Sequence, residues 1–122
     1  MADIFTLTDF HYSIAGSNTL TNVSKDPTAI YQISVYQNGG SAGFLQVYNN
    51  GTIDATAGSP DFAVPVSAGT FGAGTPSSNT ITYGPYGRRL SGGLSYLWAA
   101  GPTGTVAHGV NCTIDITYRG TL

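Results

Sequence analysis

Ionised side chains are scarce in this 122-residue chain. It has four Lys and Arg residues, six Asp and no Glu, so only 8% of its residues are charged, against about 25% in an average soluble domain. Helices draw on Glu, Lys and Arg because these long side chains lose little rotamer freedom in a helix. Their shortage, together with 17 Gly, disfavours helix and favours strands joined by turns.

Other absences exclude several classes of function. The net charge is −2, and the only adjacent basic residues are Arg88 and Arg89, whereas nucleic-acid binding needs clustered cations to displace counterions. No run reaches the ~20 apolar residues of a membrane span, and the first residues show no signal-peptide pattern. The single cysteine, Cys112, excludes an intramolecular disulfide framework. We expect a protein that folds in the cytoplasm where it is made, without nucleic-acid or membrane partners.

Motifs for catalysis are also missing. Residues 39–43 match the serine motif G-x-S-x-G, but no helix is expected after them, and we interpret the match as a turn. His11 and His108 have no supporting motif, and the six aspartates are scattered, without an acidic pair or a calcium loop. Cys112 is expected to be a buried, apolar residue of a strand. We therefore predict no catalytic residue, no metal, no cofactor and no enzymatic activity.

Alternation of apolar and polar residues is the main pattern present. It is clearest at 112–118 and at 29–36, although the second segment is partly apolar on both faces. Asn and Gly residues at 37–43 predict a tight turn. We therefore expect 29–36 and 44–48 to form a hairpin.

Further short strands are expected between turns rich in Gly, Pro and Asn. Residues 62–66 alternate, and Pro65 places this strand at an edge or a bulge because proline cannot donate to the ladder. Additional strands are predicted at 4–8, 10–14, 80–83 and 94–99. About eight antiparallel strands in a single domain, residues 1–122, predict an all-β antiparallel sandwich, jelly-roll-like or Greek-key, with an open barrel as the alternative. Residues 1–25 are either an N-terminal arm or edge strands.

Aromatic and basic residues between positions 83 and 98 are the candidate binding site. Tyr83, Tyr86, Arg88, Arg89 and Trp98 are of the types enriched at interface hot spots. We predict that they form a protein-contact patch; the alternative is that Trp98 and Tyr96 lie in the core and the two arginines are solvated. Sparse charge leaves strand edges undefended, so partner chains are expected to cover part of the surface.

Five segments, in this order, indicate a family resemblance: 30–35 (IYQISV), 44–49 (FLQVYN), 62–69 (FAVPVSAG), 90–96 (LSGGLSY) and 114–118 (IDITY). Their sequence and order resemble those of small β-sandwich proteins of tailed bacteriophages, the capsid decoration (cement) proteins and related virion accessory proteins. The resemblance implies a non-enzymatic virion protein that docks on the outer capsid surface, bridges major capsid protein subunits and associates as a homotrimer. Residues 1–25 have no counterpart in it.

Two hypotheses follow for the function. The leading one is capsid decoration, in which the chain stabilises the head by burying polar and aromatic surface against the major capsid protein. The alternative is a tail or head-fibre module that binds host-surface glycan through aromatic rings such as Tyr86 and Trp98. A hydrolase is a distant third.

Overall fold

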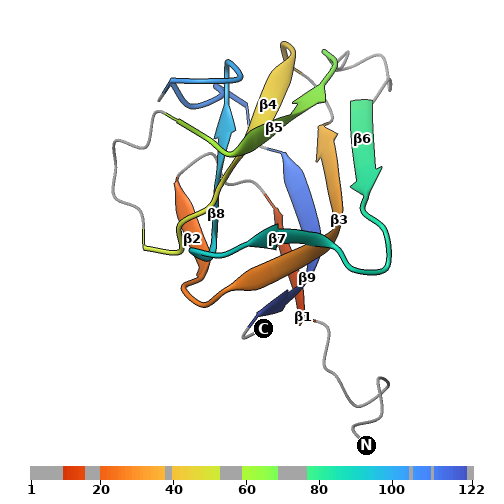
Figure 1. Cartoon of the computed structure of the whole chain (residues 1–122). Coiled ribbons are helices and arrows are strands. Elements are labelled where there is room, and N and C mark those ends of the chain that lie inside the picture. Colours follow the sequence, from red (N-terminus) through yellow and green to blue (C-terminus); the bar gives the residue numbers. More distant parts are fainter. Residues whose placement is uncertain are drawn as a thin grey trace, which may run out of the picture.

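The described residues of the computed structural model form nine strands in two antiparallel sheets (Figure 1). It describes residues 10–15, 20–37, 40–52, 59–68, 77–104, 106–110 and 112–120. The strands are β1 (Phe10–Ala15), β2 (Thr21–Ser24), β3 (Thr28–Gln37), β4 (Gly43–Tyr48), β5 (Phe62–Val66), β6 (Ser77–Thr82), β7 (Arg88–Leu90), β8 (Leu94–Ala99) and β9 (Thr113–Gly120). None of the described residues is helical, so no helix long and apolar enough to cross a membrane occurs among them.

The order of the strands is that of a jelly roll. The five-stranded sheet runs β1-β9-β3-β6, with β7 also paired to β3, and the four-stranded sheet runs β2-β8-β4-β5. The antiparallel pairs are therefore nested, because β4–β5 lies inside β3–β6, which lies inside β2–β8 and then β1–β9. A nested set of four pairs divided over two sheets is the jelly-roll form of the predicted sandwich.

The core lies between the two sheets. Side chains from both sheets meet there without exposed surface, among them Ile33, Leu45, Val64, Trp98 and Ile116. Burying a large apolar side chain contributes roughly 1.5–3 kcal/mol relative to leaving it in water. These core residues are the apolar positions of the alternating segments. Every second side chain of such a segment therefore points into the core.

A bulge in β3 reverses the alternation of that strand. Ile30 and Gln32 pair with consecutive residues of β9, so Tyr31 between them has no opposite residue. Ile30 on one side of the bulge and Ile33 on the other consequently both lie in the core, although their spacing is odd. Tyr31 is left half-buried, which explains why this segment is partly apolar on both faces.

The predicted hairpin between 29–36 and 44–48 is wrong. Both strands exist, but β3 belongs to the five-stranded sheet and β4 to the four-stranded sheet. One edge of β3 is taken by β9 and the other by β6 and β7, so β3 has no edge left for β4. The described part of the connection, residues 40–42, instead leads into β4 of the other sheet, and the side-chain amide of Gln37 donates to the carbonyl oxygen of Ser41 at 3.2 Å.

The other strand predictions have mixed outcomes. The strands at 10–14, 62–66, 94–99 and 112–118 are confirmed to within two residues, and β5 with Pro65 is an edge strand as expected. The strand predicted at 80–83 begins earlier, at Ser77, while β2 and β7 were not predicted. The strand predicted at 4–8 lies outside the described residues. Within 1–25, β1 and β2 are edge strands of the two sheets.

Candidate functional site

The outer face of the five-stranded sheet is the more open of the two outer faces. On the four-stranded sheet, the outward side chains of Gln46 and Tyr48 are buried. The Gln46 amide donates to the carbonyl oxygens of Gly101 and Gly104, at 3.0 and 3.1 Å, in the loop after β8. On the five-stranded sheet, Tyr36 is 43% exposed. The outer face of the five-stranded sheet is therefore the one more accessible to partners.

A hollow of about 470 Å³ lies on this face, where β7 pairs with β3. Ala29 of β3 is opposite Arg89 of β7 on one side and opposite Arg119 of β9 on the other. Directly opposite residues of antiparallel strands share a face, and neighbouring strands are about 4.8 Å apart. Both arginines line the hollow, so they flank a small, buried alanine in one row across three strands.

Two tyrosines complete the hollow. Tyr31, the bulged residue of β3, and Tyr86, in the turn before β7, both line it. The turn is closed by the amide N–H of Gly87, which donates to the carbonyl oxygen of Gly84 at 2.8 Å, and the positive φ of Gly87, 71°, favours glycine there. Tyr86 is 88% exposed and presents its ring to solvent beside the two arginines.

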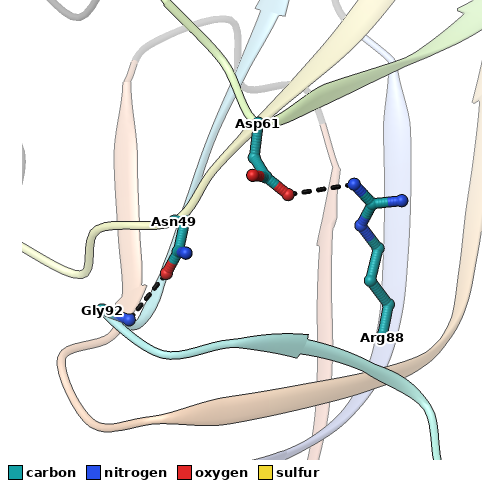
Figure 2. A network of polar contacts seen from close by, with 4 residues as sticks. All are labelled: Asn49, Asp61, Arg88 and Gly92. Carbon is teal, nitrogen blue, oxygen red and sulfur yellow. Dashed lines mark hydrogen bonds and ion pairs between the residues drawn. The ribbon is translucent and has the colours of Figure 1, made fainter.

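Arg88, the neighbour of Arg89 in sequence, lies on the opposite face of β7. Its guanidinium is 3.1 Å from the Asp61 carboxylate (Figure 2), and its Cζ lies 4.1 Å from the centre of the Phe62 ring. Tyr83 packs edge-on against Phe62 with ring centres 6.1 Å apart. The pKa of Tyr83 is raised, mainly because its side chain is partly buried. Arg88 opposes this rise, and Asp61 adds to it. Arg88 thus joins the two sheets, whereas Arg89 does not.

The predicted patch is therefore divided by the fold. Tyr86 and Arg89 lie together at the hollow, whereas Tyr83 and Arg88 lie on the other side of the sheet. Trp98 has no exposed surface, as the alternative expected of a core residue. It is therefore not part of the patch. The prediction missed Tyr31, Ala29 and Arg119, which come to the hollow from β3 and β9.

The charges of the hollow are not neutralised within the described residues. Neither Arg89 nor Arg119 forms an ion pair there, whereas Arg88 is paired with Asp61. An arginine without a carboxylate partner is free to bind one, and its planar fork of donors suits carboxylate or phosphate oxygens. The hollow therefore has the donor chemistry of a binding site for an anionic group.

His108, one of the two histidines, has a structural role. His108 is 2% exposed, and its ring stacks on Trp98 with ring centres 4.9 Å apart. Its Nε2 lies 2.8 Å from the carbonyl oxygen of Ser41 and donates to it, while Nδ1 accepts the N–H of Val110 at 3.0 Å. His11 lies in β1, opposite Thr117.

The cysteine is also buried. Cys112 is 4% exposed, and burial raises the pKa of its thiol to about 12, so the reactive thiolate is nearly absent at neutral pH. Cys112 is thus a small apolar core residue, as predicted. Across the part of the chain that the structure describes, no three His, Cys, Asp or Glu side chains are grouped to hold a metal ion.

Comparison of the chain with protein-family models, with curated proteins and with solved structures gives no match. The site is accordingly interpreted from its own geometry and chemistry.

Proposed function

We propose that this chain is a structural virion protein that binds the outer surface of a phage capsid and bridges major capsid protein subunits. The observation on which this rests is the hollow of the five-stranded sheet, where Tyr86 is 88% exposed beside Arg89 and Arg119. Tyrosine and arginine are the residue types that supply most of the binding energy at protein interfaces.

The fold and the composition support the same proposal. Jelly rolls occur in viral capsid proteins and in lectins, although a fold by itself leaves function open. Only 8% of the residues are charged, so little charge must lose its hydration when a broad face is covered. The order of the strand segments, which resembles that of capsid decoration proteins, adds the capsid as the partner.

A homotrimer is part of the proposal. One copy that uses a single hollow and its surroundings makes a small contact, and a stable interface buries at least about 1,000 Å². Three linked copies on neighbouring capsid subunits turn later contacts into intramolecular ones and multiply weak affinities. The proposed trimer thus explains how a face with few charges could hold firmly to a shell.

The test is the addition of purified chain to capsids that lack a decoration protein. We expect saturable binding at a fixed ratio to the major capsid protein, measured by co-sedimentation, and a higher temperature of capsid disruption. The chain in solution should sediment as a trimer in analytical ultracentrifugation.

Absence of both binding and capsid stabilisation would overturn the proposal. Binding to host-surface glycan in place of capsids would favour the alternative, a tail or head-fibre module. That alternative has lost Trp98, which is buried, but it keeps Tyr86 and the 43%-exposed Tyr36 as rings that could stack on sugars.

A further inference from the structure

We infer that the hollow between β7 and β9 binds the carboxylate of an acidic residue in the partner protein, which Arg89 and Arg119 clamp from two sides. The inference rests on the proposed function, since that function makes the ligand a protein. It goes further by naming the group recognised and the residues that recognise it.

The clamp is built by strand register. Arg89 and Arg119 are both direct partners of Ala29, so their strands lie on either side of it, about 10 Å apart. Ala29 is 1% exposed because Gly87 of the turn packs over it; a Cβ added to Gly87 would lie 3.2 Å from the Ala29 methyl group. The two long arginine side chains line the hollow beside this turn. The hollow of about 470 Å³ is within the usual range for a ligand site.

The charge distribution selects an anion. The whole chain has four cationic side chains; one, Arg88, is paired with Asp61, and two of the other three line this one hollow. Two cations on one row repel each other unless an anion lies between them. An acidic ligand therefore gains from both guanidinium groups and also relieves their mutual repulsion.

The surroundings favour an acidic peptide over an isolated small anion. Tyr31 and Tyr86 line the same hollow and can cover the apolar part of an extended chain. Arg89 also lines a second hollow of about 250 Å³, together with Pro27, Thr28, Leu90 and Ser91. A peptide whose carboxylate lies between the arginines can thus place its next side chain in the second hollow.

The test is NMR titration of the full chain with a capped six-residue peptide that contains one Glu next to a Leu. A matched peptide has Gln in place of Glu. We expect saturable shifts of the Arg89 and Arg119 Nε–H signals with the Glu peptide, weakening as salt is added. The Gln peptide should bind at least about fivefold more weakly, since a hot-spot contact costs more than about 1 kcal/mol when removed.

Three variants define the residues involved. Arg89→Ala and Arg119→Ala should each weaken binding of the Glu peptide at least about fivefold. Lys25→Ala removes the same charge at an exposed position outside the hollow and should leave binding unchanged. Because Arg119 is half-buried, Arg119→Lys serves as a second variant; it keeps the charge but loses the planar fork, so it too should weaken binding.

Several outcomes would overturn the inference. These are equal binding of the Glu and Gln peptides, equal loss in Lys25→Ala, or stronger shifts with glucuronic acid or inorganic phosphate than with the Glu peptide. If capsids bind the wild type and an Arg89→Ala/Arg119→Ala double variant equally well, this inference fails while the proposed function stands. If the Glu peptide binds as expected but capsids do not, the proposed function fails while the carboxylate site stands.

Discussion

Gly43 is the position where the core leaves no space for a side chain. A Cβ atom there would lie 2.4 Å from the Cη2 and Cζ2 atoms of Trp98 and 2.8 Å from Cδ2 of His108. The Trp98 indole N–H donates to the carbonyl oxygen of Val110 at 2.9 Å, and His108 stacks on the same indole. Neither ring can therefore move aside without losing a hydrogen bond or a ring contact.

Gly43→Ala should consequently destabilise the fold. We expect the free energy of unfolding to fall by about 1–3 kcal/mol, the usual cost of overpacking a core, measured by urea denaturation with Trp98 fluorescence. Gly84→Ala is the control, because no atom lies within 4 Å of its Cβ position, and it should change stability by less than about 0.5 kcal/mol. Equal effects of the two substitutions would contradict the packing described for Gly43.

At the scale of elements, β7 shows how a strand separates neighbours in sequence. Successive side chains of a strand point to opposite faces, so Arg88 lies against Phe62 and Asp61 while Arg89 lines the outer hollow. The end of β7 is held by the turn to β8, where the side-chain oxygen of Asn49 accepts the N–H of Gly92 at 2.6 Å (Figure 2). The two arginines therefore have different tasks.

Substitution of each arginine by alanine should separate stability from binding. Arg88→Ala loses a half-exposed ion pair and a cation–π contact, and we expect it to lower the free energy of unfolding by about 1 kcal/mol. Arg89 has no ion-pair partner among the described residues, so Arg89→Ala should change the free energy of unfolding by less than about 0.5 kcal/mol. Urea denaturation of both variants checks this, and a larger loss for Arg89→Ala would mean that the assignment of faces is wrong.

At the scale of the whole molecule, the nested order makes most strand pairings distant in sequence. Among the described strands, β4 and β5 are the only neighbours in a sheet that are also consecutive along the chain. The outermost pair joins β1 to β9, with almost the full length of the described chain between them. Such pairings must close long loops before they are stabilised by contacts.

Folding should accordingly be slow. We expect refolding in milliseconds to seconds, the range of β-sandwich domains dominated by distant contacts. Stopped-flow dilution from urea, followed by the fluorescence of Trp98, measures the rate, and a double-jump experiment separates any proline-limited phase. A microsecond relaxation would be incompatible with the nested topology.

Much of the fold could be predicted from particular residues. The alternation at Ile114, Ile116 and their neighbours predicted strand β9. Pro65 predicted that the strand at 62–66 lies at an edge or a bulge, and it lies at an edge. Partners in the sheets could not be predicted, because apolar alternation defines a buried face but carries no information on which strand lies alongside. The expected hairpin failed for this reason. β7 was not predicted, because a strand of three residues is too short to show an alternation of apolar and polar side chains.

The candidate site was predicted in part. Tyr86 and Arg89 were chosen for their residue types, and both line the hollow. Arg119 could not be grouped with them, since only the register across Ala29 brings it to the same row. Trp98 was chosen on the same criterion of residue type, but it lies on the same face of β8 as Leu94 and Tyr96, and this face packs into the core.

The sequence by itself determined that this chain is built of strands, which segments form most of them, and that its surface has few charges. These properties are local, because they follow from propensity and from the period of two. The tertiary structure alone decided which strands are neighbours, on which face each arginine lies, and that two of the arginines share a hollow. Such properties depend on register between segments far apart along the chain, and register is established only when the two sheets pack.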